Sequence, residues 1–270
     1  MLAVVAQLLE VTRRNQVKLV TPKLAGHAAG AVAMDSRGEK LIIKTINPPE
    51  NGFYSKQLSY QGIWIKAPDV VSDMAMYEAW HRMDRQLRHN PMIVQNLVHA
   101  GAQLHILGKN QVTSDLPELR GERDRLIDDK GNTIDTRTRG MGGRVSSCGE
   151  ENLLKLPRDR YYGRDICAHE FAHAIFGVGA SSNVRQEIIN AYHQAMPKGL
   201  WKPAYASTNP NGFFAELTMW YFGNHGDMGI PGIEVKPGPD WLKSHDPESY
   251  ALVDKIFHGR ADVKEVTDTK

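Results

Sequence analysis

The sequence predicts an α+β fold in which helices dominate the second half of the chain. The stretch YQGIWIKA at 60–67 alternates apolar and aromatic residues, as a strand does. In NPNGFFAELTMWYF, Asn209 can cap a helix, Pro210 fits its first position and Gly223 follows its end. This helix is expected over 209–222. The 270 residues are 41% hydrophobic and 24% charged, which is typical of a globular protein.

The first half of the chain predicts most of the strands and two helices. Ser72 can cap the first helix, where apolar residues recur on one stripe, and Pro91 fits the first position of the second. NPPENG at 47–52 predicts a loop. The elements expected in this half are strands at 28–45, 60–67 and 103–107, and helices at 72–88 and 91–100.

The segment 109–147 is polar and rich in loop signals, so it predicts either an excursion over the surface or a wall of a cleft. Its glycines, in RGMGG at 139–143, fit an ordinary turn best and a cleft-lining loop second. They do not form G-x-G-x-x-G after a strand, so no nucleotide site is expected. The later elements expected are a strand at 149–156 and helices at 163–177, 184–196, 209–222 and 246–259.

The charge balance argues against several classes of partner. The net charge is +2, which gives no strong field for nucleic acid, and no apolar run is long enough to span a membrane. The apolar start MLAVVAQLL fits an amphipathic first element, with a trimmed export signal as the alternative. The compartment stays open, with a secreted or periplasmic location slightly favoured over the cytoplasm, and so does the oligomeric state.

The most informative motif is His169-Glu170-Phe171-Ala172-His173, an H-E-x-x-H sequence. On a helix, residues four apart lie one turn above each other, so both imidazoles can converge on one cation. Glu170 lies on the flank of the same face and can act on a zinc-bound water. The motif therefore predicts a zinc site with Glu170 as the catalytic base.

A catalytic zinc usually has a third protein ligand. Glu216 is the best candidate, because an ionised carboxylate among the aromatic residues of its helix is costly unless it meets a cation. His225 is an alternative ligand, and His193 is expected on the surface. Phe176 stands where the metzincin pattern needs glycine, so that class is excluded.

The chain has two cysteines, Cys148 and Cys167. They could pair with each other, and the sequence does not decide this. Cys167 points to the apolar side of its helix, so a buried, inert thiol is the expected state.

HEFAHAI followed by YASTNPNGFFAELTMWYFG resembles the gluzincin metallopeptidases. Within them it is most similar to the anthrax lethal factor-like group and to uncharacterised putative metallopeptidases of bacteria and fungi. The resemblance covers roughly 60–225. It implies a zincin-like fold, with a small mixed sheet packed on the H-E-x-x-H helix. It also implies one Zn²⁺ per chain held by His169, His173 and Glu216, Glu170 as base, and Tyr205 as the residue that steadies the transition state.

Three segments are expected from this resemblance and from the sequence patterns. Residues 1–55 are an N-terminal segment of strands and loops with an open role, 56–260 a zincin-like catalytic domain, and 261–270 a polar tail.

The expected function is that of a zinc-dependent hydrolase, most simply a peptidase acting on a peptide or protein substrate. The alternatives are a zinc hydrolase of a non-peptide amide or glycan-linked substrate, and a zinc-stabilised binding protein without catalysis. The strand expected at 149–156 could present its edge to an extended peptide, which would place Gly149 and Glu150 near the cleft. A solvated strand end is the preferred interpretation of Glu150 and Glu151.

Overall fold

The computed structural model describes residues 33–35, 38–161, 163–229 and 235–266. The chain divides into two units, Met1–Ala33 and Met34–Lys270, and the described helices and strands all belong to the second unit. The apolar start of the chain lies outside the described residues, as do 28–32 and 36–37 of the strand region expected at 28–45. In the described part of that region, Met34 and Lys40 form an isolated antiparallel bridge, and a strand begins at Lys44.

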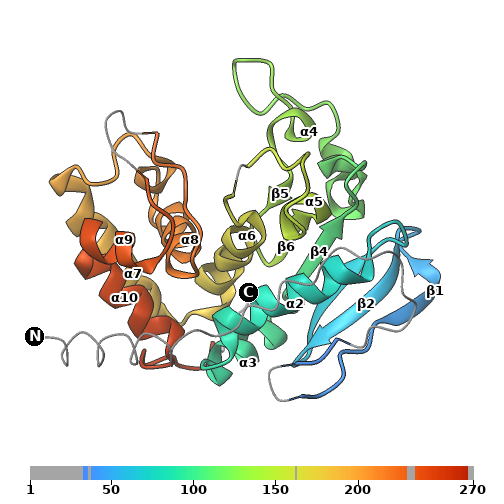
Figure 1. Cartoon of the computed structure of the whole chain (residues 1–270), viewed down its shortest axis with the longest axis horizontal. Helices are drawn as coiled ribbons and strands as arrows, with labels where there is room; N and C mark the ends of the chain where they lie inside the picture. Colours follow the sequence, from blue (N-terminus) through green and yellow to red (C-terminus); the bar gives the residue numbers. More distant parts are fainter. Residues whose placement is uncertain (1–32, 36–37, 162, 230–234, 267–270) are drawn as a thin grey trace, which may run out of the picture. The chain divides into compact units, whose positions relative to one another are not determined.

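The described residues form a mixed six-stranded sheet with helices packed around it, as the predicted α+β class requires (Figure 1). The strand order is β1-β2-β3-β4-β6-β5. Strands β3, β4 and β6 are parallel, whereas β1, β2 and β5 pair antiparallel to their neighbours. The strands are β1 (Lys44–Glu50), β2 (Tyr54–Tyr60), β3 (Ile63–Ala67), β4 (Gln103–Leu107), β5 (Gly140–Met141) and β6 (Val145–Gly149).

Local sequence explains how these strands begin and end. Gln61 and Gly62 join β2 to β3 in a two-residue turn, both with positive φ, the conformation that the tightest hairpins need. β1 includes Pro48 and Pro49, where a loop was predicted. This prediction was wrong for 47–50, because β1 is an edge strand, and an edge tolerates residues without an N–H. It was right for Asn51 and Gly52, which form the turn into β2.

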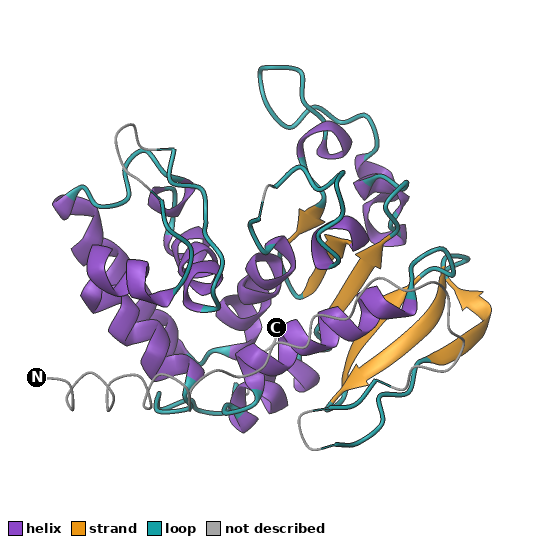
Figure 2. Ribbon diagram, in the orientation of Figure 1, coloured by secondary structure: helices purple, strands orange, loops and turns teal. Residues whose placement is uncertain are grey.

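Nine α-helices occur among the described residues, and all the helices predicted from 72 onward are present with small shifts at their ends. Figure 2 shows α2 crossing one face of the sheet, while α7, α8, α9 and α10 gather on the far side of α6 from the sheet. The helices are α2 (Asp73–Leu87), α3 (Pro91–His99), α4 (Ile134–Arg137), α5 (Glu150–Leu153), α6 (Ile166–Ala174), α7 (Ser182–Ala195), α8 (Pro210–Tyr221), α9 (Pro239–His245) and α10 (Pro247–Phe257).

Helix α2 has both the N-cap and the apolar stripe that the sequence predicts. The Ser72 side chain accepts a hydrogen bond from the Ala75 amide at 3.3 Å. Met76, Trp80 and Met83 are all buried, and they make the apolar stripe that faces the sheet. This packing holds α2 across the strands and beside α6.

The strand predicted at 149–156 was wrong. β6 spans Val145–Gly149, and the chain then turns into the short helix α5. Glu150 accepts from the Ser72 amide at 2.9 Å, and Glu151 forms an ion pair with Arg139 at 2.6 Å. Both carboxylates are buried, so the solvated strand end expected for them is also wrong. These partners lie far away in sequence, where local patterns carry no information.

The segment boundary expected between residues 55 and 56 falls inside β2. The expected polar tail makes contacts with the rest of the unit. In it, the Val266 amide donates to Asn96 at 2.9 Å and the Lys264 amide donates to Ser181 at 3.0 Å. Residues 267–270 lie outside the described part of the chain.

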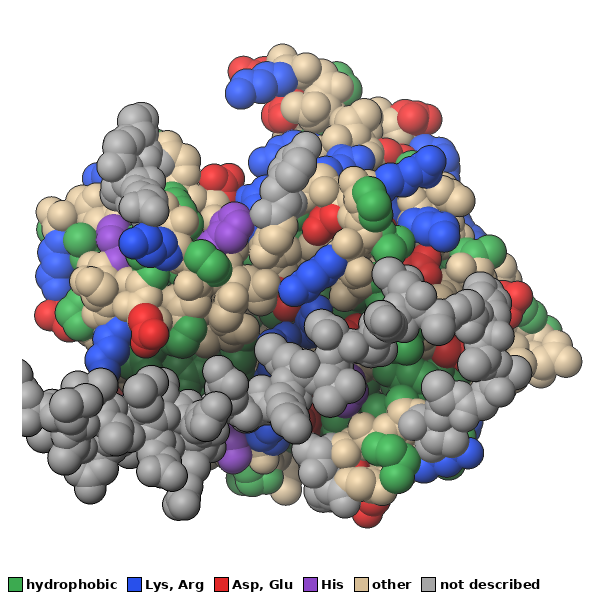
Figure 3. Space-filling model, viewed as in Figure 1, with side chains coloured by type: hydrophobic (Ala, Val, Ile, Leu, Met, Phe, Trp, Pro, Cys, Tyr) green, Lys and Arg blue, Asp and Glu red, His purple; other side chains and the backbone are tan. Residues whose placement is uncertain are grey.

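Charges of both signs are interspersed over the face in Figure 3, consistent with the small net charge. In the described part of the chain, no helix has the length and apolar character that a bilayer crossing needs.

Candidate metal centre

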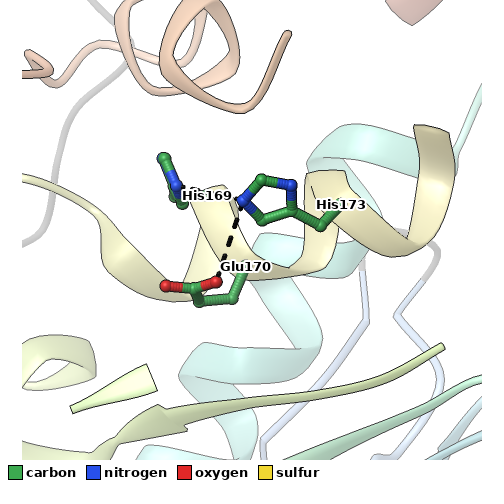
Figure 4. A group of neighbouring side chains, drawn as sticks. All are labelled: His169, Glu170 and His173. Atoms are coloured by element: carbon green, nitrogen blue, oxygen red, sulfur yellow. Dashed lines mark hydrogen bonds and ion pairs between the residues drawn. The ribbon is translucent and has the colours of Figure 1, made fainter. Parts of the chain in front are cut away.

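Helix α6 presents the two motif histidines to each other. The Nε2 atoms of His169 and His173 lie 3.2 Å apart, and Figure 4 shows both rings beside Glu170 on one helix. An oxygen of Glu170 lies 3.9 Å from Nε2 of His173. These three side chains offer ligand atoms that all lie within 4.8 Å of one another. The predicted helix thus brings the motif together as its spacing requires.

The N-terminus of α6 is fixed by two polar side chains. Asp165 accepts a hydrogen bond from the Ala168 amide at 3.1 Å, and Asn152 accepts one from the Ile166 amide at 2.9 Å. Asp165 is buried and lies 2.9 Å from the guanidinium of Arg82. The orientation of the helix face that carries His169 and His173 is therefore set one turn before His169.

Asn211, on the first turn of α8, orients His173. Its Oδ1 lies 2.7 Å from Nδ1 of His173, so the ring donates its Nδ1 proton to the amide oxygen. The neutral ring then carries a lone pair on Nε2, the form that binds a metal. Asn211 was not predicted from the sequence, since nothing in the local pattern distinguishes it from other polar residues at a helix start.

Glu216, on α8, lies on the other side of His169. Its Oε1 is 3.3 Å from Nδ1 of His169, and its Oε2 accepts a hydrogen bond from the Asp227 amide at 2.8 Å. The carboxylate is 2% exposed, so its charge acts on His169 with little screening by water. This charge favours a proton on Nδ1 and leaves the Nε2 lone pair directed at His173.

A metal ion fits between the two rings. Two Nε2 lone pairs that face each other at 3.2 Å repel unless a cation lies between them. A tetrahedral zinc ion with bonds of about 2.0–2.1 Å holds two nitrogen ligands roughly 3.3 Å apart. In the metal-free chain a proton can take the place of the metal cation, which agrees with the raised pKa of His169. The donor atoms therefore suit a zinc ion.

The pKa values of the site reflect the burial and the mutual charges of these side chains. Burial would lower the pKa of His169, but contact with Glu216 and the charge of Glu170 raise it. Burial raises the pKa of Glu170 to about 7, with His169 opposing the shift and Glu216 adding to it. Burial and the charge of His169 lower the pKa of His173 to about 4. His173 is thus neutral near pH 7, and Glu170 is poised to exchange a proton there.

Tyr205 lies beside His169 at the same cleft. Their ring centroids are 5.7 Å apart, and the tyrosine is 42% exposed. Burial of its hydroxyl, followed by the charges of Glu170 and Glu216, raises its pKa. Tyr205 therefore keeps its proton at neutral pH and can donate a hydrogen bond into the cleft.

The cleft has a volume of about 360 Å³ and is open to solvent on one side. One wall is the segment that the sequence assigned to an ordinary turn, with a cleft wall as the alternative. The structure makes it the cleft wall, including the edge strand β5. The lining residues are Thr138, Gly140, Met141, Gly142, Gly143, His169, Glu170, His173, Tyr205, Asn209 and Asn211.

Two glycines let this wall lie directly on α6. A Cβ on Gly142 would lie 2.3 Å from Cδ2 of His173, and one on Gly140 would lie 3.0 Å from Cγ of Glu170. Just before this wall, Arg139 makes a buried two-point contact with Glu151, at 2.6 and 2.8 Å. The wall is therefore anchored on one side and packed against His173 and Glu170 on the other.

The other histidines considered as ligands lie elsewhere. His193 is exposed on α7, as expected. His225 has its Nδ1 3.0 Å from the carbonyl oxygen of Gly226, and it is not part of the group formed by His169, Glu170 and His173.

No protein-family model matches the chain, and no curated protein matches it. Among solved structures it is similar to the Pro-Pro endopeptidase PPEP-2 from Paenibacillus alvei. The two are 20% identical, the match covers 67% of this chain and 91% of that one, and the TM-score is 0.44. The likeness is distant, and the function is therefore inferred from the geometry of the site.

Proposed function

We propose that this chain is a zinc-dependent peptidase of the gluzincin type, with a zincin-like fold and one zinc ion per chain. The observation that carries the proposal is the convergence of two Nε2 atoms at 3.2 Å, with the Glu170 carboxylate beside them in an open cleft. A closed structural site would use its fourth position for another protein ligand, often cysteine. Both cysteines of this chain are bonded to each other.

The residues of the site have distinct roles in this proposal. Zinc, when bound, would lower the pKa of water and polarise the scissile carbonyl. Glu170 takes a proton from the attacking water and delivers it to the leaving nitrogen, from its place beside Nε2 of His173. The Tyr205 hydroxyl donates a hydrogen bond to the oxygen on which negative charge develops. Its place beside His169 supports this role.

For Glu216 there are two roles to distinguish. The sequence and the family resemblance predict a direct ligand. The 3.3 Å contact with Nδ1 of His169 supports an orienting role instead, because that atom is not the one that faces His173. In either role the Glu216 carboxylate places a negative charge beside His169.

The cleft also supports a peptide as the substrate. β5 is the edge strand of the sheet and lines the cleft beside Glu170, so an extended peptide can pair with its free side. This replaces the peptide-binding edge expected at 149–156, since β6 lies inside the sheet between β4 and β5. Gly149 and Glu150 are not among the residues lining the cleft.

The test combines metal analysis with an unbiased peptide library. Wild-type protein is expected to hold about one zinc per chain and to cleave peptides. Glu170→Gln is expected to keep the zinc and lose cleavage, because only the proton acceptor is removed. Zinc far below one per chain, or cleavage retained by Glu170→Gln, would overturn the proposal. Turnover of small amides without peptide cleavage would point to a non-peptide substrate.

A further inference from the structure

A disulfide joins the sheet to the metal-binding helix. Cys148 on β6 is bonded to Cys167 on α6, their Cα atoms are 5.0 Å apart, and the two residues are separated by 19 positions. Both side chains are fully buried. The expected burial of Cys167 is confirmed, whereas the free thiol was wrong. The pairing that the sequence left open is present because β6 and the first turn of α6 pack closely enough for a bond.

The bond lies directly behind the metal centre. Cys167 precedes His169 by two residues on α6. Cys148 pairs across the sheet with Gly140, which packs against the Glu170 side chain. The disulfide therefore connects α6 to the strand pair that forms the cleft wall.

A hydroxyl makes a second connection between the same two elements. Ser146 lies 2.9 Å from the carbonyl oxygen of Glu170 and 2.8 Å from that of Gly143. Its single proton serves one of these acceptors at a time, so this link is weak compared with a covalent bond. The disulfide is the stronger constraint on how α6 sits against the wall.

Helix α6 needs such a constraint. Its regular part is only nine residues long, too short to be stable without tertiary contacts. It also carries His169, which is buried beside Glu216.

We propose that the bond between Cys148 and Cys167 preorganises the metal centre, so that the oxidised chain binds zinc more tightly than a chain without the bond. This proposal rests on the metal site of the proposed function. The bond forms by two exchanges with a small disulfide such as oxidised glutathione. One cysteine thiolate attacks it and expels a glutathione thiolate, and the second cysteine then attacks the mixed disulfide and expels the other. Two thiols are oxidised and one glutathione disulfide is reduced to two glutathiones.

Because both sulfur atoms are buried, the folded protein shields the bond from reductants. The native oxidised protein is therefore expected to keep its zinc affinity in a dithiol buffer, once chelation by the buffer is accounted for. Refolding under reducing conditions is expected to give the weak-binding form.

The experiment measures zinc affinity by competition with a chromophoric chelator. Cys148→Ala/Cys167→Ala is expected to bind zinc about ten-fold or more weakly than the oxidised wild type, the scale seen when support around a metal site is lost. Val253→Ala is the matched control. It removes buried methyl groups from α10 and is expected to leave zinc affinity unchanged. Equal zinc affinity in the double variant and the wild type would overturn the proposal.

A second measurement tests the proposal on wild-type protein, in case the double variant folds poorly. Amide exchange is compared between oxidised wild type and wild type refolded with reductant, both metal-free. Faster exchange at 167–173, with unchanged exchange in α10, supports the proposal, whereas identical exchange at 167–173 contradicts it. Disulfide-dependent zinc binding without any hydrolysis would remove the peptidase assignment and leave this proposal standing. Hydrolysis together with a zinc affinity that does not depend on the disulfide would refute this proposal and leave the peptidase assignment standing.

Discussion

The side chain of Asn211 accepts a hydrogen bond from Nδ1 of His173 at 2.7 Å, which connects the first turn of α8 to the second histidine of the motif. This contact fixes the tautomer and the angle of the ring. It also couples the two helices that form opposite sides of the proposed metal centre.

Asn211→Ala is therefore expected to weaken zinc binding by about ten-fold or more, since His173 loses the acceptor that holds its Nδ1 proton. The fold should persist because Asn211 is only half-buried. Zinc affinity by chelator competition is the measurement. Asn190→Ala, at an exposed asparagine on α7, is the control, and an equal effect in both variants would refute the orienting role.

Replacement of Glu216 distinguishes its two roles. If it orients His169, Glu216→Gln keeps one zinc per chain with affinity lower by about 10–100-fold. If it is a direct ligand, the variant loses a charged ligand, and stoichiometric zinc binding at micromolar concentrations is lost. Titration with zinc, read by metal content after gel filtration, separates the two outcomes. Unchanged affinity would contradict both roles.

Gly142 is expected to tolerate no side chain. A Cβ there would lie 2.3 Å from the His173 ring, so Gly142→Ala must displace either the ring or the cleft wall. We expect peptide cleavage to fall by about 100-fold, the effect of a displacement near 1 Å in an active site. Gly177→Ala is the matched control, because a Cβ at Gly177 meets nothing within 4 Å. Equal activity in both variants would count against the close packing of the wall.

The metal-free protein is expected to show a pH dependence that comes from Glu170. Its pKa is about 7 in the folded chain instead of 4.5, so the folded state holds the proton more tightly. The resulting stability is present below pH 4.5 and is lost as pH rises through 7. His169 and Glu216 face the same carboxyl group. Both remain in the comparison variant Glu170→Gln, but His169 there loses the part of its raised pKa that comes from the Glu170 charge.

The measurement is urea unfolding of wild type and Glu170→Gln with chelator, from pH 4.5 to 7.5. The wild type should lose about 3 kcal/mol relative to the variant over this range. His173 acts in the opposite direction, because its pKa is lowered to about 4, but its effect is common to both proteins and cancels. Parallel pH profiles would show that Glu170 is not perturbed.

Much of the helical framework is predictable from local signals. Ser72, Asn209 and Pro91 mark helix starts where the structure has them, because capping depends on residues close in sequence. Strand assignment was less reliable. The residues after β6 turn into α5 because Glu150 and Glu151 find partners at Ser72 and Arg139, and such distant contacts leave no periodic trace in the sequence.

The sequence by itself predicted the chemistry of the candidate site. The spacing within HEFAH is enough to bring His169 and His173 together, since a helix converts four residues into one turn. The tertiary structure alone decided which atoms meet around them. Asn211 lies at Nδ1 of His173, Glu216 lies at Nδ1 of His169, Gly140 and Gly142 of the cleft wall pack against α6, and Cys148 is bonded to Cys167. These contacts join segments that meet only when α6, α8 and the edge of the sheet pack together, and long-range packing is not encoded in local spacing.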